Sequence, residues 1–221
     1  MVRKGVFITG TGTDVGKTFV TALLVKKFRD SGIDAFYYKA ALSGVSLNSD
    51  QGSVSDVQYV KTIASLPETH ETLVSYVYQE AVSPHLAARK EGNPLELSKV
   101  VSDYQLLKSK HDFIFVEGSG GIVCPIRYDN QKIFLEDIIK ALGLEIILVS
   151  NALLGSINAT VLTVEYARSR GIGIRGIILN QYQGSEMEQD NYKMIQEITG
   201  VPILATVPLN AKEIELNIEG V

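Results

Sequence analysis

Short, apolar, β-prone runs alternate with amphipathic helical segments along most of the 221-residue chain. The run 113–116 carries no polar residue, which is typical of a strand buried on both faces of a parallel sheet. Hydrophobic periodicity predicts strands at 6–9, 35–39, 113–116, 145–149, 174–179 and 203–207, and helices at 18–29, 56–65, 95–109, 134–142, 157–170 and 187–198. Strands separated by helices form βαβ units, so we expect an α/β fold of three layers with a mostly parallel central sheet.

Composition narrows the classes of protein to consider. Hydrophobic residues make up 45% and charged residues 21%, as in an ordinary globular protein, and no linker or repeat interrupts residues 1–221, so we expect a single domain. A net charge of −4 argues against a nucleic-acid partner. No apolar run is long enough to span a membrane, and residues 1–5 lack a signal peptide's apolar stretch, so no membrane partner and a cytoplasmic location are expected. Cys124, the single cysteine, excludes an intrachain disulfide and is expected to be a small buried apolar residue.

A glycine-rich segment, GTGTDVGKT at residues 10–18, follows the first predicted strand and opens the first predicted helix. In this context glycines let backbone N–H groups converge on phosphate oxygens, and the helix N-terminus adds partial positive charge. Lys17 can reach the β- and γ-phosphates, and the Thr18 hydroxyl can hold Mg²⁺. Five residues rather than the common four separate Gly10 from Gly16. The segment predicts a long phosphate-binding loop (P-loop) and hence a P-loop NTPase-like fold.

Two carboxylates stand where a metal ligand is expected. Glu117 directly follows a fully apolar strand, and Asp56 lies at the start of a predicted helix. Mg²⁺ prefers hard oxygen ligands, so Thr18, Asp56 and Glu117 form a candidate set completed by phosphate oxygens. A helix-capping role remains open for Asp56. Asp14, inside the P-loop, either faces a cationic partner or is a solvated loop acid.

The residues after the last two predicted strands suggest which base is bound. Asn180 and Gln183 stand where guanine-specific proteins carry Asn-Lys-x-Asp, and Gln183 lacks the charge of that aspartate. An asparagine amide can pair with the N6 and N7 edge of adenine. Pro208 and Leu209 follow the last strand and are placed to flank the base. We therefore expect ATP.

Five segments together resemble dethiobiotin synthetases, in the family's order and over roughly residues 4–210. They are the P-loop and residues 38–44 (YKAALSG), 83–88 (SPHLAA), 116–121 (VEGSGG) and 154–158 (LGSIN). The resemblance implies closure of the ureido ring of 7,8-diaminononanoate with CO₂, ATP and Mg²⁺, through a carbamate and a carbamic–phosphoric anhydride. The chain departs from the family at Ala40, where proline is common. Pro84 and His85 match a family turn, for which a structural role is expected.

The resemblance also implies a role for each matching residue. Lys17 would neutralise the transferring phosphoryl group, Lys39 would act as a second catalytic lysine, and Thr13 and Ser43 would hydrogen-bond the carbamate or γ-phosphate. Nucleotide contacts are expected from Gly12, Asp14, Val15, Gly16, Lys17, Thr18, Phe19, Asn180, Pro208 and Leu209. Contacts to the substrate are expected from Ser43, Leu154, Gly155, Ser156, Asn158 and Tyr192. In the family this tyrosine comes from the partner subunit, which implies a homodimer with shared sites.

Two other functions compete with the synthetase. A partitioning ATPase switch of the same superfamily carries an extra lysine at the start of its P-loop, whereas residues 9–12 read TGTG. Its membrane-binding forms need a basic amphipathic segment, and residues 211–221 are acidic. An amidotransferase needs a glutaminase domain with a nucleophilic cysteine, and the chain is too short to hold one. The synthetase is the preferred interpretation.

Overall fold

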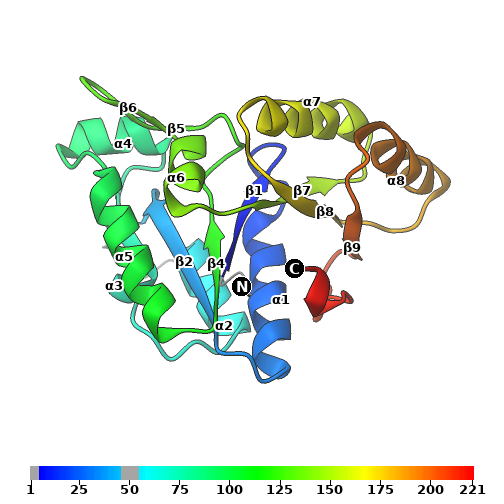
Figure 1. Ribbon diagram of the computed structural model, residues 1–221, viewed down its shortest axis with the longest axis horizontal. Coiled ribbons are helices and arrows are strands. Elements are labelled where there is room, and N and C mark those ends of the chain that lie inside the picture. Colours follow the sequence, from blue (N-terminus) through cyan, green and yellow to red (C-terminus); the bar gives the residue numbers. More distant parts are fainter. Residues whose placement is uncertain (1–4, 46–54) are drawn as a thin grey trace.

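A seven-stranded parallel sheet forms the centre of the computed structural model, which describes residues 5–45 and 55–221 (Figure 1). Its strand order is β3-β2-β4-β1-β7-β8-β9, and every neighbouring pair is parallel. The strands are β1 (Gly5–Gly10), β2 (Ala35–Leu42), β3 (Val74–Val77), β4 (Phe113–Glu117), β7 (Ile146–Asn151), β8 (Ile174–Asn180) and β9 (Ile203–Val207). A separate antiparallel pair joins β5 (Pro125–Tyr128) to β6 (Lys132–Phe134).

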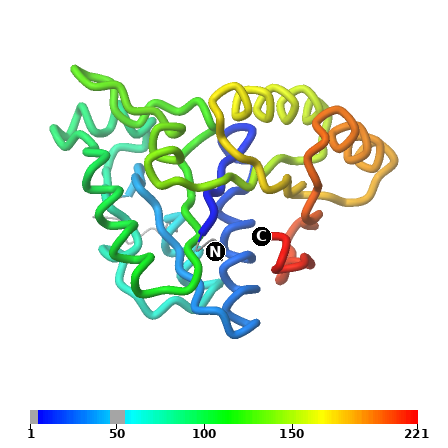
Figure 2. The backbone as a smooth tube through the Cα atoms, viewed as in Figure 1, coloured from blue at the N-terminus to red at the C-terminus, as the bar shows by residue number. Residues whose placement is uncertain are grey.

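Helices cover both faces of the sheet, as the backbone in Figure 2 also shows. The helices are α1 (Lys17–Asp30), α2 (Asp56–Ile63), α3 (His70–Leu73), α4 (Pro84–Glu91), α5 (Leu97–Lys110), α6 (Leu135–Leu142), α7 (Ser156–Ser169), α8 (Glu186–Thr199) and the 3₁₀ turn η1 (Ile218–Gly220). Connections through α1 and α2 run towards the β3 edge, and those through α5 to α8 run towards the β9 edge. Because such crossovers are right-handed, the two groups of helices lie on opposite faces.

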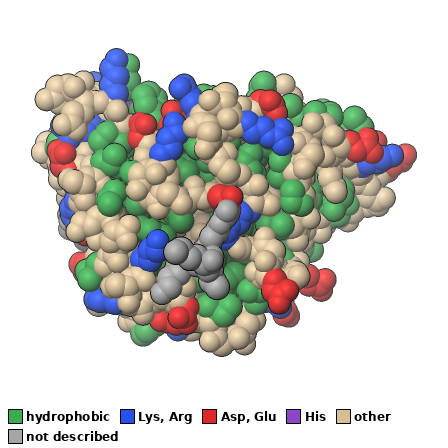
Figure 3. All heavy atoms as spheres, in the orientation of Figure 1, with side chains coloured by type: hydrophobic (Ala, Val, Ile, Leu, Met, Phe, Trp, Pro, Cys, Tyr) green, Lys and Arg blue, Asp and Glu red, His purple; other side chains and the backbone are tan. Residues whose placement is uncertain are grey.

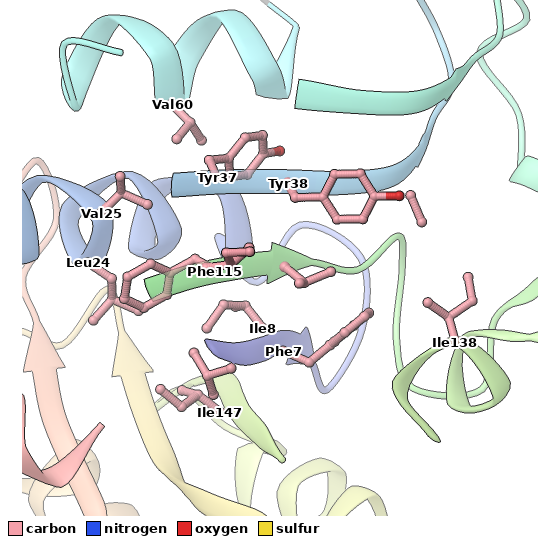
Figure 4. Close-up of a cluster of buried hydrophobic side chains, with 14 of the residues drawn as sticks. Phe7, Ile8, Leu24, Val25, Tyr37, Tyr38, Val60, Phe115, Ile138 and Ile147 are labelled. Carbon is pink, nitrogen blue, oxygen red and sulfur yellow. The ribbon is translucent and has the colours of Figure 1, made fainter. Parts of the chain in front are cut away.

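The core lies where β1 and β4 meet the helices. Phe7, Ile8 and Phe115 are fully buried, and Leu24 of α1 packs beside them (Figure 4). Strands this apolar cannot leave either face in water, which explains why the sheet is covered on both sides. The predicted α/β fold is confirmed: a mostly parallel central sheet lies between two layers of helices.

Several local predictions differ from the structure. β2 ends at Leu42, three residues beyond the predicted strand 35–39. The turn expected at Pro84 and His85 is the first turn of α4, because proline's fixed φ and missing N–H suit the start of a helix. The sequence analysis did not predict β3, α3 or the β5–β6 hairpin.

The exposed face carries side chains of both charges, and the C-terminal segment lies beside the start of β1. Side chains of both charges are interspersed over the face shown in Figure 3. Arg175 of β8 donates hydrogen bonds to the backbone carbonyls of Val221 and Gly5, which holds the C-terminal segment beside the start of β1. Among the described residues, no helix has the length and apolar character needed to cross a membrane.

Candidate active site

The P-loop connects β1 to α1 and is closed by its own lysine. Lys17 is the first residue of α1 and is 7% exposed, and its Nζ donates to the carbonyl oxygen of Gly12 at 2.9 Å. Gly16 and Asp14 both have positive φ, at 86° and 60°, so the loop curls tightly before the helix begins. Burial lowers the pKa of Lys17, and the Glu117 carboxylate only partly offsets this effect.

Asn180, at the end of β8, supports the P-loop from the side. It is 2% exposed, and its Nδ2 donates to the carbonyl of Val15 at 3.0 Å. A Cβ on Gly16 would collide with this amide nitrogen, so the close approach requires glycine. Pairing of the Asn180 amide with both N6 and N7 of adenine, as expected from the sequence, stays a prediction. The amide nitrogen keeps a second hydrogen beyond the one donated to Val15, and Oδ1, buried without a partner among the described residues, can accept a hydrogen bond.

The expected magnesium ligands meet around Lys39. Lys39 of β2 lies opposite Glu117 of β4 in the sheet register, and its Nζ lies 2.9 Å from Glu117 Oε1 and 2.5 Å from Asp56 Oδ2. The Thr18 hydroxyl donates to the same Glu117 Oε1 at 2.7 Å. Tyr37, which was not singled out from the sequence, is a third partner of Glu117 and donates to its Oε2 at 2.9 Å. Neighbouring strands and the starts of α1 and α2 thus bring these groups together.

Burial and charge set the protonation of this cluster. The Lys39 and Glu117 side chains are 4% and 1% exposed, respectively, and that of Asp56 is 44% exposed. Burial alone lowers the pKa of Lys39, but the carboxylates of Glu117 and Asp56 outweigh it and raise the pKa. Burial raises the pKa of Asp56, and the Lys39 ammonium outweighs it and lowers the pKa. Lys39 is therefore an ammonium at neutral pH, held between the Asp56 and Glu117 side chains.

The donor atoms of this cluster fit Mg²⁺. Thr18, Asp56 and Glu117 offer one hydroxyl and two carboxylates, all hard oxygen ligands, and a cation already lies between the two carboxylates. In the described part of the chain no group of three or more His, Cys, Asp or Glu side chains could hold a metal ion. A set with so few carboxylates suits an ion that keeps waters and completes its shell with substrate phosphates. Ser55, rather than Asp56, provides the cap of α2, because its hydroxyl accepts from the N–H of Gln58.

A pocket of about 870 Å³ opens beside this cluster. Its lining includes ten of the expected site residues, which come from the P-loop, the start of α1, β2 and the residue after it, α2 and the end of β4: Thr13, Asp14, Gly16, Lys17, Thr18, Phe19, Lys39, Ser43, Asp56 and Glu117. Leu42, Tyr59, Ala81, Val82, Ser83 and Cys124 also line the pocket but were given no site role from the sequence, and Pro84 was expected to be structural. Of these, only the position of Cys124, just after the glycine-rich segment 117–121, could have indicated its place.

The remaining expected residues lie outside this lining in the described chain. Gly155, with φ of 90°, precedes α7, and the Ser156 hydroxyl at the start of that helix is buried without a hydrogen-bond partner among the described residues. Leu154 is 90% exposed. Tyr192 of α8 is half-buried against the smaller apolar cluster between α7, α8 and the β8 side of the sheet. The other expected residues away from the pocket are Gly12, Val15, Asn158, Asn180, Pro208 and Leu209.

The loops that follow β8 and β9 lie against each other near Asn180. The Tyr182 N–H donates to the carbonyl of Val207 at 3.0 Å, and Pro208 and Leu209 follow directly. Glu188 of α8 accepts hydrogen bonds from the N–H groups of Gln183 and Ser185. This side of the P-loop is therefore bordered by two loops joined to each other, next to the unpartnered Asn180 Oδ1.

Two solved structures share the fold of this chain. A solved septum site-determining protein MinD of Pyrococcus horikoshii, complexed with Mg-ADP, has a TM-score of 0.54 and 21% identity, covering 92% of this chain and 81% of that one. A ParA family ATPase of Chlorobium tepidum has a TM-score of 0.56 and 16% identity, covering 94% and 86%. At these identities the two structures support the P-loop fold alone.

The sequence relatives are more specific. A family model described as an AAA domain matches residues 4–215. An ATP-dependent dethiobiotin synthetase of Brachyspira hyodysenteriae is 50% identical over 208 residues, covering 93% of this chain and 92% of the relative. Another from Clostridium perfringens is 48% identical over 208 residues, covering 94% and 91%. The chain therefore belongs to the family of ATP-dependent dethiobiotin synthetases.

Proposed function

We propose that the pocket beside the P-loop closes the ureido ring of dethiobiotin from 7,8-diaminononanoate, CO₂ and ATP. The observation that carries this assignment is the pair of buried lysines, Lys17 and Lys39, on one pocket with the Thr18, Asp56 and Glu117 oxygens. A phosphoryl transfer to a carbamate needs cations on both the transferring group and its acceptor. A partitioning switch is disfavoured because the P-loop start, TGTG at 9–12, lacks the lysine that such switches carry.

The chemistry has three balanced steps. One substrate amine adds to CO₂ and loses a proton, giving a carbamate. A carbamate oxygen then attacks the γ-phosphorus of ATP, ADP leaves, and a carbamic–phosphoric anhydride forms. The second amine attacks the carbamate carbon and loses a proton as inorganic phosphate leaves, which closes the ring. The chain acts mainly by positioning and charge stabilisation, as in other phosphoryl transfers.

The two lysines have distinct tasks in this proposal. Lys17 exchanges the Gly12 carbonyl for β- and γ-phosphate oxygens, a favourable exchange because a charged acceptor replaces a neutral one. Lys39 turns from Asp56 and Glu117 towards the carbamate and the γ-phosphate. Thr13 and Ser43, which line the same pocket, donate hydrogen bonds to these anions. Asp14, exposed at the pocket's edge, attracts the substrate's ammonium groups.

Thr18, Asp56 and Glu117 are proposed to hold Mg²⁺. The ion, when bound, neutralises charge on the phosphates of ATP. Gly12, Val15, Gly16 and Phe19 belong to the same nucleotide site, the first three through the loop backbone. The Asn180 Oδ1 atom accepts from the adenine N6 amine, and Pro208 and Leu209 flank the base. The carboxamide of Gln183 lacks the charge that guanine-selective proteins use, which favours ATP.

The carboxylate of the substrate is proposed to bind at the N-terminus of α7. The amides from Leu154 to Ser156 and the Asn158 side chain lie at this helix start, and the buried Ser156 hydroxyl has no partner there among the described residues. These residues do not line the pocket of their own chain, which supports a site completed across a homodimer with Tyr192 from the partner subunit. A single domain and a cytoplasmic location complete the proposal.

Labelled bicarbonate tests this function. The protein is incubated with ATP, Mg²⁺, 7,8-diaminononanoate and ¹³C-bicarbonate, and the product is analysed by mass spectrometry. Dethiobiotin carrying one ¹³C atom is the expected result, and Lys17→Ala protein is the matched control that should form none. Absence of labelled dethiobiotin from the unmodified protein, under conditions in which ATP is bound, would contradict the proposal.

A further inference from the structure

The Tyr37 hydroxyl is a buried donor to Glu117 that the proposed chemistry does not use. Tyr37 and Lys39 are two residues apart in β2, so their side chains leave the same face of the sheet, and Lys39 lies opposite Glu117 of β4. Tyr37 is fully buried, and Figure 4 shows its ring near Val60 of α2. Its hydroxyl donates to Glu117 Oε2 at 2.9 Å and is directed at one oxygen of the carboxylate.

The two oxygens of Glu117 have different surroundings. Oε1 accepts from the Thr18 hydroxyl and the Lys39 ammonium, both of which line the pocket. Oε2 accepts from Tyr37, which does not line the pocket. When nucleotide and metal bind, Thr18 and Lys39 acquire new partners, whereas Tyr37 remains buried behind the carboxylate.

We propose that Tyr37 is a positioning residue that holds Glu117 Oε2, so that Oε1 is the oxygen presented to Mg²⁺. This inference rests on the proposed magnesium site. A carboxylate with 1% of its side chain exposed needs hydrogen bonds in place of the lost water, and Tyr37 still supplies one after Lys39 has turned away. Removing an outer partner of a metal ligand typically weakens metal affinity about 10–100-fold.

The test compares Mn²⁺ binding by Tyr37→Phe and Tyr38→Phe. The measurement is the Mn²⁺ dissociation constant of the complex with a non-hydrolysable ATP analogue, from the EPR signal of free Mn²⁺. Tyr37→Phe keeps the buried ring and removes the hydroxyl, and its dissociation constant should rise about 10–100-fold. Tyr38→Phe removes the hydroxyl of a comparably buried tyrosine, whose partners are Ser75, at 2.5 Å, and the Val100 carbonyl, at 3.4 Å, and it should bind Mn²⁺ like the unmodified protein.

Turnover gives a second readout that a purely structural role would not produce. For Tyr37→Phe the Mg²⁺ concentration at half-maximal rate should rise by the same factor, with kcat restored at saturating Mg²⁺ and the KM for the diamine unchanged. Melting curves establish that both variants are folded. In a Glu117→Gln background, adding Tyr37→Phe should change the Mn²⁺ affinity less than about threefold, because the carboxylate that it holds is gone.

Each failure has its own signature. If Glu117→Gln alone leaves Mn²⁺ affinity unchanged, the magnesium site itself is wrong. If Glu117→Gln weakens Mn²⁺ binding but Tyr37→Phe does not, the Tyr37 inference is overturned and the metal site stands. Equal weakening by Tyr37→Phe and Tyr38→Phe would also overturn it, because the effect would then be general to buried tyrosines.

Discussion

The Lys39 ammonium lies between the Asp56 and Glu117 carboxylates, the two carboxylates that are proposed to hold Mg²⁺. This ammonium bridges Asp56 and Glu117, so the chain itself offsets part of the negative charge of this cluster. In the proposed site, Mg²⁺ and the Lys39 ammonium compete for the same oxygens, and binding of Mg²⁺ would free Lys39 for the anionic reactants. This exchange would couple the binding of Mg²⁺ to the release of Lys39 towards the reactants.

Replacing Lys39 by methionine tests that exchange. Removing one member of a buried ion pair typically costs about 3–5 kcal/mol of stability, so Lys39→Met should melt at a lower temperature in EDTA. Added Mg²⁺ should raise its melting temperature more than that of the unmodified protein, because no ammonium competes for the oxygens. Turnover should be lost. An equal Mg²⁺ effect on both melting temperatures, by scanning calorimetry, would contradict the exchange.

Cys124 lines the pocket but is expected to be unreactive. Burial raises the pKa of its thiol to about 11, with Lys17 opposing the shift. Because the thiolate is the reactive form, alkylation by iodoacetamide near pH 7.5 should be roughly two to three orders of magnitude slower than for a free thiol. The rate should climb with pH and reach half-maximum near pH 11. Half-maximal labelling near pH 8.5 would contradict this prediction, and urea-unfolded protein is the control.

At the scale of elements, contacts with Asn180 fix the shape of the P-loop. Gly16 has φ of 86°, and a Cβ there would collide with the Asn180 amide. Gly16→Ala should therefore lose ATP binding and destabilise the protein by at least the ~1–2 kcal/mol cost of this backbone conformation. Asn180→Ala added to Gly16→Ala removes the collision and leaves the backbone cost. Calorimetric ATP binding close to normal in Gly16→Ala would show that the loop does not need this approach.

The Glu188 carboxylate near the start of α8 stabilises the loop beside Asn180 in a pH-dependent way. The Ser185 hydroxyl and nearby backbone amides lower the pKa of Glu188. A carboxylate with a lowered pKa contributes stability above its unfolded pKa, about 4.3, and loses it as pH falls through the folded value. Glu188→Gln should therefore melt lower than the unmodified protein near pH 6, and the gap should shrink towards pH 3.

The control for Glu188→Gln is Glu186→Gln, which removes the same charge from an exposed position in the first turn of α8. Its melting temperature should stay close to that of the unmodified protein across the same pH range. A gap between Glu188→Gln and the unmodified protein that does not depend on pH would contradict the role of the Glu188 carboxylate. Circular dichroism melts at each pH provide the comparison.

Long periodic elements were predictable, and short ones were not. The apolar strand 113–116 and the helix after the P-loop carry strong local signals, and both were located from sequence. The four-residue β3 at the sheet edge and the β5–β6 hairpin have too few residues for a period to show, and β5 also carries a register shift. The contact between Lys39 and Glu117 depends on strand register, which no local pattern gives.

Site residues that belong to a strong local motif were likewise predictable from the sequence, and a residue whose role depends on a three-dimensional contact was not. The P-loop and Glu117 were identified because their motifs stand at strand ends, where ligands of such sheets bind, and Lys39 was identified through the family resemblance of residues 38–44. Tyr37 was missed, although its position two residues before Lys39 places it on the same face. Its significance depends on a hydroxyl reaching one oxygen of Glu117, a three-dimensional fact that sequence spacing does not contain.

At the scale of the molecule, the carboxyl edge of the sheet carries the pocket, while the α7 N-terminus and Tyr192 lie outside its lining. A shared dimer site predicts complementation between two inactive variants. In co-expressed Lys17→Ala and Tyr192→Ala chains, half the dimers are mixed, and each mixed dimer has one intact site. Activity should return to about a quarter of the normal value. No recovery in the mixed preparation, despite confirmed mixed dimers, would show that each site is built from one chain.

The central claim is that phosphoryl transfer at this pocket serves a carbamate made from a diamine. Release of inorganic phosphate from ATP tests it most directly, measured with each substrate omitted in turn. Phosphate release should require both 7,8-diaminononanoate and bicarbonate and fall to background when either is absent. Phosphate release that ignores the diamine, and responds instead to DNA or lipid vesicles, would contradict it.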